Sequence, residues 1–171
     1  LKRYSAMDWD QIPGDEKTML RMVVNSDDED IRNQIKHNGE GSLADCGIEV
    51  PVLLDSGASI SCITPKWAQE LERKLKWTRS KGRQFRVENG GETDEIFSGE
   101  YLEIPVLKTN RRNSHFTKFF IMPSNKCSFN ILLGKEDMKQ IGYKIAMKVA
   151  PDQVLMAVDG DKPDNDHWNP L

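Results

Sequence analysis

The chain has 171 residues, of which 37% are hydrophobic and 30% are charged, and its net charge at pH 7 is −3. This length and apolar content suit one single-core domain with flanking segments. The apolar runs fall far short of the roughly 20 residues of a membrane span, and the basic excess typical of nucleic-acid binding is absent. We therefore expect no membrane association and no nucleic-acid partner.

The three cysteines, Cys46, Cys62 and Cys127, are odd in number and widely spaced. No Cys-x-x-Cys pair occurs, and the histidines lie near no cysteine pair. The sequence thus predicts neither a zinc site nor a disulfide framework, and we expect no metal and no other cofactor. Because a signal-peptide pattern and a glycosylation sequon are also lacking, we expect an intracellular protein with reduced thiols.

Composition divides the chain into three zones. Residues 1–41 form a polar N-terminal flank that contains a candidate strand at 18–24 and an acidic run at 27–30, which we expect to be a solvated loop. Residues 42–149 carry most of the β-pattern and are predicted to be the folded domain. Residues 150–171 are rich in Pro, Asp and Asn and are predicted to be a polar C-terminal tail.

Short β-rich segments bounded by Gly, Asn and Pro dominate the middle zone. The predicted strands are 48–54, 85–87, 101–107, 116–122, 129–133 and 143–149, with a further short strand at 154–158 in the tail. This many short strands with Gly-bounded turns favours an all-β protein built as a small closed β-barrel-like fold.

One or two short helices are expected within this β-fold. Thr64 can be the N-cap of the first helix, and Pro65 suits its first turn because the missing N–H costs nothing there. Apolar residues then recur at i, i+4 and i+8, which places on one helix face Trp67, Leu71 and Leu75. Residues 135–141 are predicted to add one or two helical turns.

The segment that carries chemistry begins at Asp55, directly after the aliphatic run 50–54. An ionised carboxylate in apolar surroundings is costly unless hydrogen bonds or a shared proton compensate. Ser56 offers a hydroxyl, and Gly57 lets the backbone approach the carboxylate closely. Asp-Ser-Gly is also a common turn sequence, so its functional meaning depends on the sequence around it.

That surrounding sequence resembles the retropepsin-like aspartic proteases. Leu-Leu-Asp-Ser-Gly-Ala-Ser at 53–59 is similar to their active-site loop, and residues 131–138 resemble their apolar-apolar-Gly signature and short C-terminal helix. The similarity covers roughly residues 46–149, and the helix after the loop resembles the LTR retrotransposon members of the Ty3/gypsy or BEL type. Two positions depart from the family, since Ser56 replaces a more usual threonine and Lys135 a common arginine.

The resemblance implies an aspartic endopeptidase in which Asp55 is the catalytic carboxylate. Ser56, Gly57 and Ala58 would complete the active-site loop, with the Ser56 hydroxyl bonding across a dimer. The chemistry needs two carboxylates that share a proton, and the chain has one Asp-Ser-Gly. The resemblance therefore implies a homodimer that presents Asp55 twice across a two-fold axis.

The resemblance also implies a substrate-binding region and a substrate. The corresponding residues are those of a flap tip, Asn89, Gly90 and Gly91, and those of a pocket wall, Leu132, Leu133 and Gly134. The substrate would be a peptide segment of the element's own polyprotein, cleaved between apolar residues. The enzyme would then act in the cytoplasm or within virus-like particles.

Two alternatives remain open at this level. A retropepsin-like domain can serve as a catalytically silent dimerisation or binding module, although the intact Asp55 loop argues against this. Asp-Ser-Gly followed by Ser61 also distantly resembles a disordered, phosphorylated motif read by a ubiquitin ligase. The apolar flanks of the loop argue for burial in a folded domain instead.

Overall fold

The computed structural model describes residues 2–3, 17–38, 47–88, 94–109, 111–127, 129–147 and 155–158. Strands dominate these residues, as the sequence predicted. In chain order the strands are β1 Lys2–Arg3, β2 Lys17–Val23, β3 Gly47–Leu54, β4 Ser61–Ile63, β5 Ser80–Lys81, β6 Phe85–Val87, β7 Glu95–Phe97, β8 Glu100–Lys108, β9 His115–Ile121, β10 Ile131–Leu133, β11 Lys144–Met147 and β12 Leu155–Val158.

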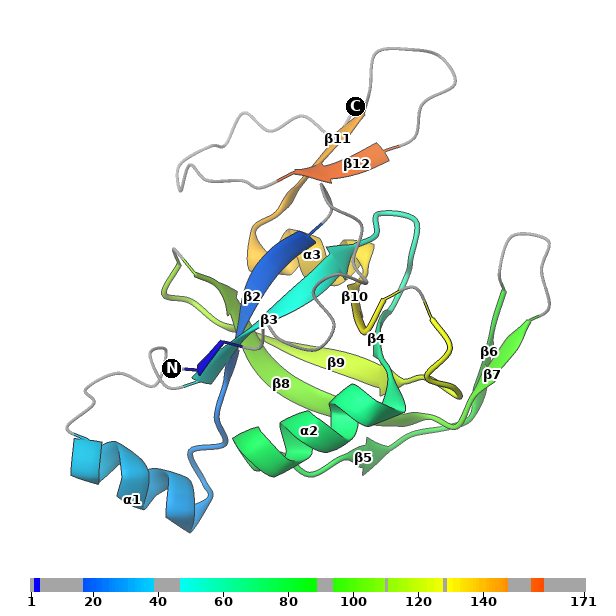
Figure 1. Ribbon diagram of the computed structural model, residues 1–171. Helices are drawn as coiled ribbons and strands as arrows, with labels where there is room; N and C mark the ends of the chain where they lie inside the picture. Colours follow the sequence, from blue (N-terminus) through cyan, green and yellow to red (C-terminus); the bar gives the residue numbers. More distant parts are fainter. Residues whose placement is uncertain are drawn as a thin grey trace.

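Six of these strands close into a barrel, in the order β3, β10, β4, β9, β8, β2 and back to β3 (Figure 1). The ring closes because β2 pairs antiparallel with both β3 and β8. Two pairs in the ring are parallel, β10 with β3 and β4 with β9. β1 pairs with β3 and β5 with β8 outside the ring. The protein is therefore an all-β protein with a small closed barrel.

The barrel interior follows the period-2 alternation of its strands. In β3, Ile48, Val50 and Val52 are buried in the core, and Leu20 and Met22 of β2 join them. β2 thus completes the barrel, so the barrel includes part of the segment that the sequence analysis assigned to an N-terminal flank. A boundary at residue 42 is too late for this unit, because without β2 the ring would stay open.

Three helices accompany the barrel: α1 Glu29–Asn38, α2 Pro65–Leu75 and α3 Lys135–Ile141. The predicted helix after Thr64 is confirmed as α2, and its apolar face is buried in the barrel core. α1 was not expected. The acidic run is only partly a loop, because Asp28 Oδ1 accepts the N–H of Ile31 at 3.1 Å and starts a helix at Glu29. Acidic residues in the first turn also suit the helix dipole.

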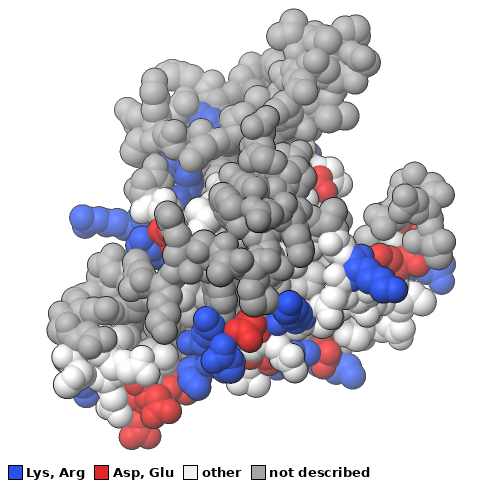
Figure 2. Space-filling model, in the orientation of Figure 1, with Lys and Arg blue, Asp and Glu red and all other residues white. Residues whose placement is uncertain are grey.

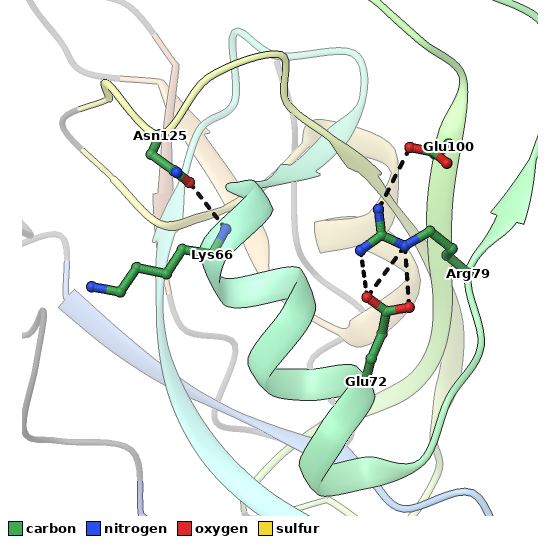
Figure 3. Close-up of polar contacts among 5 residues, drawn as sticks. All are labelled: Lys66, Glu72, Arg79, Glu100 and Asn125. Atoms are coloured by element: carbon green, nitrogen blue, oxygen red, sulfur yellow. Dashed lines mark hydrogen bonds and ion pairs between the residues drawn. The ribbon is translucent and has the colours of Figure 1, made fainter.

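Polar contacts at both ends of α2 fix its position (Figure 3). Thr64 occupies the N-cap position, but its side chain makes no capping hydrogen bond. Asn125 Oδ1 instead accepts the Lys66 N–H at 3.0 Å. Near the other end, Arg79 bonds the Glu72 carboxylate and reaches Glu100 of β8 at 3.5 Å. The charged residues on the described part of the face in Figure 2 are mixed in sign, with acidic and basic side chains lying side by side.

The strand predicted at 143–149 is β11, which forms a separate two-stranded sheet with β12 (Figure 1). The predicted short strand in the tail is thus confirmed at Leu155–Val158. Tyr143 precedes β11 and is 3% exposed in the barrel core. Among the described residues, no helix is long and apolar enough to cross a membrane.

Candidate active site

The Asp55 loop lies between two barrel strands that share one neighbour. β3 ends at Leu54, the chain turns through residues 55–60, and it returns as β4. β10 lies between them, parallel to β3 and antiparallel to β4. The Asp55 N–H donates to the Leu133 carbonyl at 3.0 Å, which extends the β3–β10 ladder by one residue. The start of the loop is therefore held by the barrel, which argues against a disordered motif.

Backbone donors hold the Asp55 side chain within its own loop. Its Oδ1 accepts the Gly57 N–H at 2.9 Å, and its carbonyl accepts the Ala58 N–H at 3.2 Å. This is an Asx-type turn, in which the side chain replaces a backbone acceptor. The side chains of Asp55 and Ser56 are half-buried. The predicted support of the carboxylate by Gly57 is confirmed, and Asp55 is held in place while remaining partly open to solvent.

The second half of the loop is attached to the junction of β10 and α3. The Lys135 N–H donates to the Ala58 carbonyl at 2.9 Å. A Cβ on Gly134 would lie 2.6 Å from the Ile60 carbonyl oxygen and 3.1 Å from that of Ala58. Because Gly134 has no side chain, the backbone of the Asp55 loop can lie close to it. Gly134 therefore contributes no side chain to a pocket wall.

A polar network that the sequence analysis missed continues from this junction. The Gly134 N–H donates to Ser61 Oγ at 2.9 Å, and Ser61 Oγ donates to Asp137 Oδ2 at 2.6 Å. The other oxygen of Asp137 lies 3.2 Å from Nε2 of His115. Ser61 is buried, whereas Asp137 and His115 are partly exposed. The network links β4, α3 and β9 directly behind the Asp55 loop.

The two leucines predicted to line a pocket point to opposite sides of β10. Leu133 is fully buried in the barrel core and presents no exposed surface beside Asp55. Leu132 lies on the outer side, opposite Leu53 of β3 and Cys62 of β4. The same alternation places Leu54 against the core and Leu53 outside. On the outer side, Leu53 is partly exposed and Leu132 is buried.

Leu132 belongs to a second apolar group, here called the outer cluster. It joins the Asp55 loop to the hairpin of β6 and β7, which projects from the barrel in Figure 1. Its members are Leu53, Ala58, Ile60, Cys62, Phe85, Val87, Phe97, Phe120, Met122, Cys127, Phe129 and Leu132. The cluster puts an apolar surface next to the carboxylate, which suits the binding of apolar side chains.

Aromatic contacts fix the base of the hairpin on the barrel. Phe85 of β6 stacks on Phe97 of β7 at 5.1 Å and meets Phe120 of β9 edge-on at 5.0 Å. Such pairs add about 1 kcal/mol each beyond the burial of their area. The predicted flap-tip residues Asn89, Gly90 and Gly91 lie outside the described residues.

Two free thiols lie in the outer cluster, and both are hard to ionise. Burial raises the pKa of Cys62 to about 12, helped by the nearby charges of Cys127, Glu95 and Asp55. Burial and Glu95 also raise the pKa of Cys127. Among the described residues, no group of three or more His, Cys, Asp or Glu could hold a metal ion.

We expect Cys62 to resist alkylation at neutral pH. With a pKa of about 12, only about one thiol in ten thousand is ionised at pH 8, and the thiolate is the nucleophile. Its reaction with iodoacetamide should therefore speed up about tenfold per pH unit, and Cys127 should react first at pH 8. Peptide mapping by mass spectrometry measures both rates, and equal rates at pH 8 would contradict the buried placement of Cys62.

No protein-family model matches the chain, and a search of curated proteins finds no significant match.

Proposed function

We propose that the chain is one subunit of a retropepsin-like aspartic endopeptidase, of the LTR retrotransposon type, with Asp55 as its catalytic carboxylate. The observation that carries the proposal is the Asp55 loop. A partly exposed carboxylate follows a buried strand, accepts a backbone N–H at 2.9 Å, and borders an apolar cluster. Carboxylates in such settings are suited to acid–base work on a bound peptide.

The proposed chemistry needs Asp55 from each of two subunits. Two carboxylates about 3 Å apart cannot both ionise easily, so they share one proton. The ionised carboxylate takes a proton from a water molecule, and the oxygen of that water attacks the scissile carbonyl carbon, while the protonated carboxyl group gives its proton to the carbonyl oxygen. The first carboxyl group then passes the proton taken from water to the amide nitrogen, and the second takes a hydroxyl proton from the tetrahedral intermediate as the C–N bond breaks.

The second subunit is proposed to be another copy of this chain. The single Asp-Ser-Gly of the sequence supplies one carboxylate, and a two-fold axis would bring two copies face to face. The β11–β12 sheet is a candidate contact, because a two-stranded sheet of four-residue strands is marginally stable alone. Pairing with the same sheet of a partner would stabilise both.

The proposed substrate is an extended polyprotein segment with apolar residues on both sides of the scissile bond. Leu53, Leu132 and the hairpin residues Phe85 and Val87 belong to the apolar outer cluster, which includes residues of the Asp55 loop. A hairpin edge also offers backbone groups for strand-like pairing with a peptide. Cleavage of a peptide library should therefore favour apolar central positions, and a profile with charged residues at both positions would count against the proposal.

Dilution tests the dimer directly. The specific activity of the free chain should fall as the chain concentration drops below the Kd of the dimer, because monomers hold one carboxylate. A fluorogenic peptide assay and sedimentation on the same samples measure activity and mass together. A tandem of two copies joined by a flexible linker is the control, and its specific activity should persist on dilution. Full activity from a proven monomer would contradict the proposal.

The alternative is a silent module that keeps the fold and the dimer without hydrolysis. The peptide assay, combined with sedimentation, separates the silent module from the protease. Dimers that cleave no peptide of the library would favour the silent module, whereas Asp55-dependent cleavage would favour the protease.

A further inference from the structure

The β6–β7 hairpin has two chemically different faces. Its cross-strand pairs are Phe85 with Phe97, Arg86 with Ile96, and Val87 with Glu95. Side chains directly opposite each other in a hairpin lie on the same face. The first and third pairs share one face, and three of these four residues pack in the outer cluster. The middle pair lies on the other face, where Ile96 is 50% exposed.

Glu95 is therefore a half-buried carboxylate on the face that meets the outer cluster. Among the described residues, the side chain of Glu95 has no hydrogen-bond or ion-pair partner. Its neighbour Asp94 pairs with Arg86 at 3.6 Å instead. A carboxylate beside apolar side chains without a cation is unfavourable, so this position suits a cationic group.

Glu95 lies on the same side of the barrel as Asp55. The charge of Glu95 raises the pKa of both Cys62 and Cys127, and the charge of Asp55 also raises that of Cys62. The packing agrees, because Val87 and Phe97 on the face of Glu95 share the outer cluster with Cys62. Cys62 lies opposite Leu132, and Leu132 lies opposite Leu53, two residues before Asp55. A peptide that reaches Asp55 along the outer cluster would thus pass within the field of Glu95.

We propose that Glu95 forms a cation-selecting subsite, which takes a lysine or arginine side chain of the substrate near the apolar residues at the scissile bond. This inference rests on the proposed function and adds a specificity that the apolar outer cluster does not provide. A partly exposed ion pair contributes about 1 kcal/mol, which corresponds to about a fivefold preference.

The charge selectivity can be measured without catalysis. Cys127 is a partly exposed thiol near Glu95, so it can report on the local charge through its reaction with methanethiosulfonates. In a Cys46→Ser background, the trimethylammonium-ethyl reagent should react faster than the sulfonato-ethyl reagent. The ratio of the two rates cancels any change in thiol ionisation. This ratio should fall about fivefold in Glu95→Gln.

Asp94→Asn is the matched control, since it removes one negative charge from the adjacent residue, which pairs on the other face of the hairpin. The rate ratio should stay unchanged in this variant. An unchanged ratio in Glu95→Gln, or an equal fall in both variants, would overturn the inference.

A lysine scan through an apolar peptide substrate tests the specificity itself. The parent enzyme should prefer lysine over norleucine at one flanking position by about fivefold, and Glu95→Gln should lose that preference while Asp94→Asn keeps it. Cleavage with no Glu95-dependent preference would overturn this inference and leave the proposed function standing. Conversely, the ratio of the two methanethiosulfonate rates could depend on Glu95 while no peptide is cleaved. That result would support a cation site at Glu95 and contradict the proposed protease.

Discussion

Asp55→Asn should abolish peptide hydrolysis, lowering kcat/KM by about a thousandfold or more. The substitution removes both carboxylates of the proposed dimer at once, and an amide can neither take the proton from water nor share one with its mate. The amide oxygen can still accept the Gly57 N–H that Asp55 Oδ1 accepts at 2.9 Å. The loop should therefore keep its shape.

Circular dichroism, thermal unfolding and sedimentation are the controls for this variant. All three should match the parent protein, because the change is isosteric and Asp55 lies outside the barrel core. Hydrolysis that persists in a pure Asp55→Asn preparation would contradict the assignment of Asp55 as the catalytic carboxylate. Loss of activity together with loss of the dimer would instead show that Asp55 acts in assembly.

Gly134→Ala should destabilise the protein by about 3 kcal/mol and also remove activity. The added Cβ would lie 2.6 Å from the Ile60 carbonyl oxygen and 2.7 Å from the Ile60 carbonyl carbon. These are backbone atoms of the Asp55 loop, so relief of the contact must move the loop itself. Denaturant unfolding measures the loss in the free energy of unfolding, and peptide hydrolysis reports the displacement of Asp55.

Gly82→Ala is the matched control for this effect. Its Cβ would lie 3.5 Å from the Gly99 carbonyl oxygen, which is an ordinary contact, and Gly82 is exposed. We expect a change within about 0.5 kcal/mol and full activity. Equal losses in the two variants would contradict the close approach of the loop to Gly134.

The sequence predicted those parts of the fold whose signal is local. Thr64 and Pro65 marked the start of α2, and the spacing of its apolar residues marked the buried face. The period-2 alternation of apolar residues indicated the strands, and the same alternation predicts which side chains of β3 point into the barrel. Because Val50 and Val52 point inward, the same alternation predicts that Leu54 also points inward, and Leu133, its partner in β10, lies in the core with it.

Other features depend on long-range pairing and had no local signal. The closure of the barrel by β2 requires its register with both β3 and β8. The network of Ser61, Asp137 and His115 combines residues from three separate segments. The orientation of Glu95 follows from its pairing with Val87 across the hairpin. α1 is different, since the Asp28 cap was present in the sequence and was missed.

Mixing the parent chain with the Asp55→Asn chain tests the central claim most directly. The total chain concentration is kept constant and well above the Kd of the dimer, and hydrolysis is measured after the subunits have exchanged. If each active site needs Asp55 from two chains, activity falls as the square of the parent fraction, to about a quarter at equal amounts. A linear fall, to about half at equal amounts, would mean that each chain acts alone and would contradict the shared carboxylate pair.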